Sequence, residues 1–117
     1  MADVTATAPP AISEAAFTAN VIALARMHGW LAYHALPART NKGWRTLTMG
    51  NVGFPDLVLA RPGGLIFAEL KTERGVLSPS QFQWTEALVD ALAGHGETLR
   101  YEVWRPSQLQ EIEELLR

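Results

Sequence analysis

The chain has 117 residues, a length that suits one domain, and 48% of them are apolar, which is enough to bury a hydrophobic core. It contains no cysteine, which excludes a disulfide framework and a thiolate metal site and fits a reducing cytosol. No apolar run approaches the ~20 residues that a membrane-spanning helix needs, so we expect no membrane partner.

The net charge of −2 does not by itself indicate a nucleic-acid-binding protein, but the charges are unevenly distributed. No Asp or Glu lies between Ala15 and Pro55, a stretch that contains Arg26, Arg39, Lys42 and Arg45. An ordinary uneven surface charge would also explain this pattern, and that alternative stays open.

The first part of the chain predicts a leader, a helix and a strand. Residues 1–12 are expected to be a disordered leader without the basic and apolar regions of a secretory signal, followed by a single domain at 13–117. Residues 13–29 predict a helix that Ser13 caps and Gly29 ends. Aromatic and apolar residues at 30–36 predict a strand. Residues 37–55 follow as a long loop, with a short strand at TLTM (46–49) as an option.

The second part predicts a β-hairpin, a helix, a strand and a helix. The strands at 57–60 and 65–71 are joined by RPGG, a turn sequence. A helix at 78–94 has Ser78 as N-cap, Pro79 in its first turn and a terminal Gly94. A strand at 99–104 precedes a last helix at 107–117, where Ser107 and Gln110 have capping-box spacing.

The order α-β-β-β-α-β-α predicts an α/β (α+β) fold with a mixed four-stranded sheet flanked by helices, because a strand–helix–strand step gives a parallel pair. Apolar spacing predicts core positions on the last two helices and strand. These are Trp84, Leu88 and Ala91, and also Trp104 and Ile112 with Leu115 or Leu116, for which a dimer face is the alternative.

Two acids take corresponding positions in the predicted hairpin. If residues 61–64 form the loop, Ala60 pairs with Leu65, and by extension Asp56 lies opposite Glu69 with Cβ atoms ~5 Å apart. Side-chain alternation puts Lys71 on the same face. A slip of one residue would move Asp56 to the other face, so this prediction depends on the register.

Two carboxylates so close need a compensating positive charge. Lys71 can supply one, but carboxylate oxygens are also preferred ligands of Mg²⁺, which lowers the pKa of bound water and stabilises a phosphorane. Lys71 could then orient or deprotonate an attacking water. The alternative is a pair of solvated acids at strand ends, with Lys71 as a surface ion-pair partner.

PD at 55–56 followed by ELK at 69–71 resembles the PD-(D/E)XK nuclease motif. The Gly in GFPD, the run ELKTERGVLSPSQ, the Trp and Leu further along that helix, and YEVWRP together resemble the VRR-NUC (virus-type replication-repair nuclease) domain. The resemblance covers the chain from about Ser13 to its end. It implies a restriction-endonuclease-like α-β-β-β-α-β core and metal-dependent hydrolysis of DNA phosphodiesters.

The resemblance also implies roles for individual residues. Asp56 and Glu69 correspond to the metal ligands, with the main-chain carbonyl of Leu70 as a further ligand and Lys71 as the catalytic lysine. Glu14 matches an acid that often completes such sites, although the helix dipole alone favours an acid there. Gln81 matches a glutamine near the active site, although it is also the capping-box partner of Ser78.

Residues 37–52 do not resemble the family strongly, so their role is predicted from physical chemistry alone. Cations can contact phosphates and an aromatic ring can stack on a base, which makes Arg39, Lys42, Trp44 and Arg45 candidate DNA-binding residues. The alternative is a solvated loop with Trp44 packed on the core. His34 could face the site or be an ordinary strand residue, and the spacing of the histidines does not suggest a zinc site.

We therefore expect a Mg²⁺- or Mn²⁺-dependent DNA endonuclease. The resemblance implies a homodimer that cuts branched DNA such as Holliday junctions, in the cytoplasm (the host cytoplasm if a phage encodes it). The alternative is a non-catalytic nucleic-acid-binding or assembly subunit that retains the fold.

Overall fold

The computed structural model describes residues 12–36, 38–45 and 47–117. The predicted leader lies outside the described residues except for Ile12, as do Pro37 and Thr46.

Helix α1 spans Glu14–Met27 and has the predicted ends. The Ser13 hydroxyl accepts a hydrogen bond from the Ala16 N–H at 3.1 Å. Gly29 follows the helix with φ of +85°, a conformation that glycine adopts without strain. One face of α1 is buried through Phe17, Val21 and Ala25.

The predicted fold class is confirmed by a mixed sheet in the order β1-β4-β5-β6. Its strands are β1 (Leu31–His34), β4 (Leu57–Arg61), β5 (Gly64–Leu70) and β6 (Leu99–Trp104). β4 pairs antiparallel with β1 and β5, whereas β5 and β6 are parallel. Ala60 lies opposite Leu65 as predicted, and one further pair, Arg61 with Gly64, shortens the turn to two residues without changing the register.

The long loop expected at 37–55 contains a second, two-stranded sheet, which the sequence analysis missed. β2 (Ala38–Thr40) pairs antiparallel with β3 (Gly43–Arg45). The optional strand at TLTM was wrong, because Leu47, Thr48 and Met49 form no strand and Thr46 lies outside the described residues. Gly43, with φ of +98°, completes the tight turn between the two strands.

Helix α2 spans Pro79–Leu92, and its capping box between Ser78 and Gln81 is present as predicted. The predicted core role of its apolar stripe was wrong, since α2 has no buried residue. Trp84 and Leu88 are half-buried, and Ala91 is exposed. The helix covers only part of a sheet face, so its apolar stripe stays partly open.

The chain ends in η2 (Pro106–Gln108) and α3 (Leu109–Leu116). The predicted capping box of Ser107 and Gln110 was wrong, because the Ser107 hydroxyl donates to Glu73 Oε2 at 3.1 Å. Gln108 Oε1 instead accepts the Arg105 N–H at 2.8 Å.

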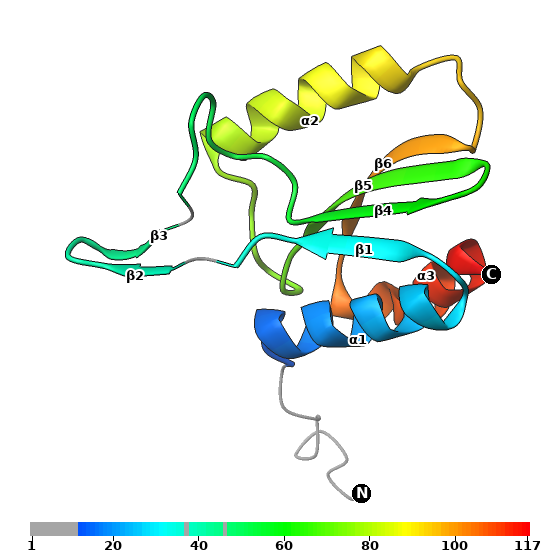
Figure 1. The fold of residues 1–117 in the computed structure, drawn as a ribbon, viewed down its shortest axis with the longest axis horizontal. Coiled ribbons are helices and arrows are strands. Elements are labelled where there is room, and N and C mark those ends of the chain that lie inside the picture. The colour runs from blue at the N-terminus through cyan, green and yellow to red at the C-terminus, as the bar shows by residue number, and fades with distance from the viewer. Residues whose placement is uncertain (1–11, 37, 46) are drawn as a thin grey trace, which may run out of the picture.

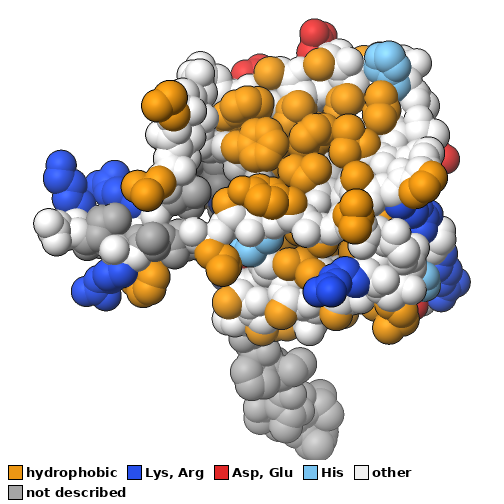
Figure 2. All heavy atoms as spheres, in the orientation of Figure 1, with side chains coloured by type: hydrophobic (Ala, Val, Ile, Leu, Met, Phe, Trp, Pro, Cys, Tyr) orange, Lys and Arg blue, Asp and Glu red, His pale blue; other side chains and the backbone are white. Residues whose placement is uncertain are grey.

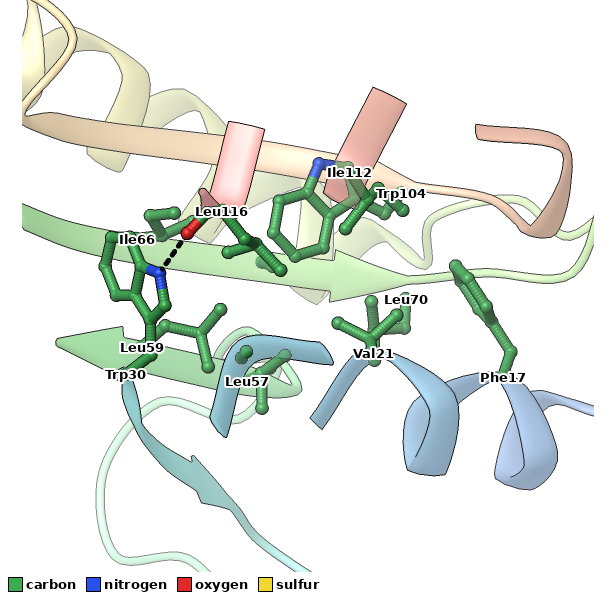
Figure 3. Close-up of a cluster of buried hydrophobic side chains, with 12 residues drawn as sticks. Phe17, Val21, Trp30, Leu57, Leu59, Ile66, Leu70, Trp104, Ile112 and Leu116 are labelled. Atoms are coloured by element: carbon green, nitrogen blue, oxygen red, sulfur yellow. Dashed lines mark hydrogen bonds between the residues drawn. The ribbon is translucent and has the colours of Figure 1, made fainter. Parts of the chain in front are cut away.

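The helices cover the two faces of the sheet unequally (Figure 1). α1 and α3 lie on one face and α2 on the other. The core lies on the α1 and α3 side, where β4 and β5 contribute Leu57, Leu59, Ile66, Ala68 and Leu70. The predicted core residues Trp104, Ile112 and Leu116 belong to it, and Leu115 packs against it. At the edge of this core, Trp30 Nε1 donates a hydrogen bond to the Leu116 carbonyl at 2.9 Å (Figure 3).

Among the described residues, no helix combines the length and the apolar character needed to cross a membrane.

Candidate active site

The predicted acidic pair lies at the end of the sheet where β1 and β5 finish and β4 begins (Figure 1). The last ladder pair of β4 and β5 is Leu57 with Ala68, and both side chains are in the core. Asp56 and Glu69 are the next residues beyond this pair. Because successive side chains of a strand point to opposite faces of the sheet, both carboxyl groups point toward the α2 face. The predicted register, which decided this placement, is confirmed.

Glu69 is fully buried (0% exposed), even though it carries an ionisable carboxyl group. Burial, followed by hydrogen bonding to Asp56 and repulsion from its charge, raises the pKa of Glu69 from 4.5 to about 9, and the nearby Lys71 only partly opposes this. Without a cation, the protonated form of Glu69 is therefore favoured at neutral pH.

Asp56 is anchored through both its side chain and its main chain. Its Oδ2 accepts the Leu70 N–H at 2.9 Å, which ties the carboxylate to the neighbouring strand. Its carbonyl oxygen lies 2.7 Å from His34 Nδ1. A carbonyl can only accept, so Nδ1 of His34 carries the hydrogen. His34 pairs with Leu57 across β1 and β4, so its side chain lies on the same face as that of Leu57, which is the α1 face. From this face His34 supports the Asp56 backbone.

Gln81 connects the acid pair to Lys71. Its Oε1 accepts from Lys71 Nζ at 2.8 Å and from the Ser78 N–H at 2.9 Å. Its Nε2 donates to Glu69 Oε1 at 3.3 Å. The capping-box role and the position beside the candidate site are therefore compatible, and both use the same amide group.

The donor set fits a divalent cation. Glu69 Oε2 is buried and has no hydrogen-bond partner among the described residues, a condition that is costly unless a ligand compensates it. Asp56 contributes a second carboxylate next to it. Leu70 lies between Glu69 and Lys71, and its N–H donates to Asp56 Oδ2, so the backbone at Leu70 runs beside the acid pair. Such oxygen ligands suit Mg²⁺ or Mn²⁺.

Glu14 is exposed in the first turn of α1. α1 starts at the same end of the sheet but packs on the opposite face from Glu69. Within residues 12–36, 38–45 and 47–117, no three Asp, Glu or His side chains are placed to hold a metal ion together. The structure thus brings together Asp56, Glu69, Lys71 and Gln81, and the role of Glu14 stays a prediction.

The candidate DNA-binding residues are on the β2–β3 hairpin, which projects from the body of the molecule (Figure 1). Trp44 is 66% exposed, so the alternative that it packs on the core was wrong. The Arg39 guanidinium lies 5.8 Å from the centre of the Trp44 ring. A cleft of about 770 Å³ joins the hairpin to the acid pair, and Arg45, Tyr33, Asp56 and Gln81 are among its lining residues.

The sequence analysis named Gly53 and Arg105 only as parts of motifs and missed that both residues order the loops around the site. Arg105 donates to the carbonyls of Thr72, Glu73 and Gly75, at 2.6, 3.2 and 2.8 Å. This holds the loop between Lys71 and α2. Gly53 lies so close to α2 that an added Cβ would be 2.5 Å from the Ser80 carbonyl carbon. The glycine of GFPD was the available signal for Gly53.

A small polar contact lies under α2. The Tyr101 and Thr85 hydroxyls are 2.6 Å apart. Burial raises the pKa of Tyr101, Thr85 opposes the change, and the charges of Glu69 and Asp56 add to it. Tyr101 is therefore a neutral hydroxyl within the field of the acid pair.

Comparison of the sequence with protein-family models and with curated proteins finds no match.

Proposed function

We propose that this protein is a divalent-cation-dependent endonuclease that hydrolyses phosphodiester bonds in DNA, as its resemblance to VRR-NUC nucleases implies. The observation that carries the proposal is the fully buried Glu69, whose Oε2 has no hydrogen-bond partner among the described residues and which lies beside Asp56 and Lys71. Burying a carboxyl group beside a second one costs folding free energy, and strongly shifted pKa values are concentrated at functional sites. A catalytic role therefore explains this arrangement better than a contribution to folding stability does.

Asp56, Glu69 and the Leu70 carbonyl would hold Mg²⁺ or Mn²⁺. The bound cation supplies positive charge that offsets the negative charge developing on the phosphate. Glu69 is ionised in that state, which requires it to release the proton that it otherwise holds.

Lys71 and Gln81 orient the reacting groups. Lys71 Nζ has three donor hydrogens, and Gln81 Oε1 accepts one of them. In the proposed reaction another is donated to a phosphate oxygen or to the attacking water. Gln81 holds the ammonium group at a constant position relative to Glu69, because its amide contacts both side chains.

The proposed substrate is branched DNA such as a Holliday junction, and the proposed cutting unit is a homodimer. A twofold symmetric pair presents two sites to two strands. Exposed apolar side chains support a protein partner, since Leu31 on β1 is 78% exposed and Val89 on α2 is 53% exposed. The proposed location is the cytoplasm, or the host cytoplasm if a phage encodes the protein.

Cleavage of a labelled four-way junction and of linear duplex with the same sequence tests the proposal. Wild type should cut in Mg²⁺ or Mn²⁺ and not in EDTA. Glu69→Gln keeps the size and hydrogen-bonding capacity of the side chain but not its charge, and it should lower the rate by at least about 100-fold. Glu86→Gln, a matched change at an exposed position of α2, should cut like wild type.

A wild-type protein that binds these DNAs in EDTA and never cuts them in Mn²⁺ would reject the proposal. It would favour the alternative of a non-catalytic nucleic-acid-binding or assembly subunit.

A further inference from the structure

The β2–β3 hairpin carries cations on both of its faces. Arg39 and Trp44 are paired across the two strands, so their side chains share one face. Arg45 is the next residue along β3 and therefore points to the other face, where it lines the cleft. Lys and Arg side chains accordingly appear on both sides of the projecting hairpin (Figure 2). A hairpin that only lay along the surface of a duplex would need cations on one face.

The cleft on the inner side of the hairpin has aromatic and apolar walls. Tyr33 is 63% exposed although it is a β-strand residue, and Phe54 is 41% exposed. Both line the cleft together with Arg45, Asp56 and Gln81. Figure 2 shows a broad group of apolar side chains on this side of the molecule. A ligand in this cleft would thus contact aromatic rings as well as Asp56 of the acid pair.

The cations of the hairpin and the aromatic rings of the cleft are complementary to different features of a ligand. The hairpin cations, in a stretch that has no acid from Ala15 to Pro55, are complementary to a polyanion. Exposed rings bind the flat faces of nucleobases, which a duplex hides by stacking and pairing. An unpaired nucleic-acid strand has both phosphates and accessible base faces. Of the forms that DNA takes, it matches the cleft best.

We infer that the hairpin separates the two strands of DNA at a branch point. One unpaired strand enters the cleft, with a phosphate on Arg45 and a base on Tyr33, and leads to Asp56 and Glu69. Trp44 and Arg39 contact the DNA that stays on the outer side of the hairpin. This inference rests on the proposed function only in taking DNA as the polymer, and it narrows the substrate to DNA with an unpaired segment.

Binding measured by fluorescence anisotropy in EDTA tests the inference without any need for cleavage. The probes are a forked DNA with two unpaired arms and a fully paired duplex of the same sequence. Wild type should bind the fork more tightly than the duplex. Tyr33→Ala and Trp44→Ala should each weaken fork binding about tenfold, the size of one lost stacking contact, and change duplex binding little.

Matched variants separate stacking from misfolding and from general charge. Tyr33→Phe keeps the ring and should bind the fork like wild type. Phe82→Ala removes a ring that is similarly exposed, at 52%, but does not line the cleft, and it should have no effect. Arg45→Ala should lower the slope of log affinity against log salt by about one for the fork, whereas exposed Arg26→Ala on α1 should not.

Equal affinity of wild type for fork and duplex would overturn the inference. So would an equal loss of fork and duplex binding in Tyr33→Ala and Trp44→Ala. Fork binding that depends on these rings, without cleavage in Mn²⁺, would uphold the inference and reject the proposed nuclease. Cleavage that depends on Glu69 but not on Tyr33 or Trp44 would support the proposed nuclease and overturn the inference about strand separation.

Discussion

Glu69 makes the stability of the cation-free protein depend on pH. Its pKa is raised from 4.5 to about 9, so the folded state holds its proton more tightly than the unfolded state does. The resulting stabilisation is fully present below pH 4.5 and is lost as the pH rises through about 9. Over that window the free energy of unfolding should fall by at most about 1.4 kcal/mol per pH unit because of this group.

Glu69→Gln should remove this contribution, since an amide does not ionise there. Urea unfolding in EDTA at several pH values between 5 and 9 should show a steeper decline for wild type than for Glu69→Gln. Glu86→Gln should decline like wild type. Parallel curves for wild type and Glu69→Gln would mean that Glu69 is not protonated in the fold.

The same proton should couple cation binding to pH. A divalent cation between Asp56 and Glu69 requires Glu69 to ionise, so binding releases a proton. Mn²⁺ affinity should rise with pH below about 9, by at most about tenfold per unit. Titration calorimetry in two buffers with different ionisation enthalpies would count the protons. Equal affinity at pH 6 and pH 8.5 would contradict this description of the site.

At the scale of elements, Gly53 determines how closely the segment before Asp56 approaches α2. Trp84 Nε1 reinforces that contact by donating to the Val52 carbonyl at 3.1 Å. An added Cβ at residue 53 would be 2.5 Å from the Ser80 carbonyl carbon and 2.8 Å from the Gln81 nitrogen. Because both are backbone atoms, α2 itself would have to move.

Gly53→Ala can be compared with Gly50→Ala, because both glycines have positive φ, at +94° and +102°. Nothing lies within 4 Å of an added Cβ at Gly50. Gly50→Ala should therefore cost only the backbone strain, about 1–2 kcal/mol. Gly53→Ala should cost about 1–3 kcal/mol more, from the overlap with α2. Equal values in urea unfolding would show that the close approach does not constrain the fold.

Arg105 has a comparable role for the loop that joins Lys71 to α2. Its guanidinium donates to three loop carbonyls, while Glu73 accepts from the Ser107 N–H and hydroxyl, contacts that lower the pKa of Glu73. Arg105→Ala should cost about 1–3 kcal/mol by leaving these carbonyls unpaired. Amide exchange should accelerate in residues 72–77 and not in α1.

Arg74→Ala provides the control for Arg105, because Arg74 is an exposed arginine in the same loop. It should leave exchange in residues 72–77 unchanged. If both variants exchange alike, Arg105 does not order the loop. Arg105→Lys should recover only part of the protection, since an ammonium group cannot reproduce the planar fork of donors.

At the scale of the whole molecule, the sheet and the acid pair were predictable from the sequence. The turn at 61–64 determines which residues of β4 and β5 face each other, and period-2 alternation then places Asp56 with Glu69. The ends of α1 and α2 were also predictable, because Ser13, Ser78 and the terminal glycines act within one turn.

Features that depend on tertiary packing were not predictable in this way. The apolar spacing of Trp84 and Leu88 indicates a helix face but not how much surface lies opposite it, so the exposure of α2 was missed. Ser107 has the spacing of a capping residue, but its hydroxyl is bound to Glu73, 34 positions away. The burial of Glu69 likewise follows from the helix and loop that cover it.

The exposed apolar surface leads to a prediction for the assembly. Leu31 lies on β1, an edge strand of the sheet, and is 78% exposed. Edge strands with exposed apolar side chains favour pairing with another chain. Sedimentation equilibrium should therefore give twice the chain mass of 12.9 kDa.

Leu31→Lys should shift the equilibrium to monomer, because it would bring two positive charges together in a symmetric contact. Phe82→Lys, the same type of change on α2, should stay dimeric if β1 forms the contact. A monomer at all concentrations, with and without DNA, would contradict the proposed homodimer while leaving the acid pair and its chemistry to be judged by the cleavage assay.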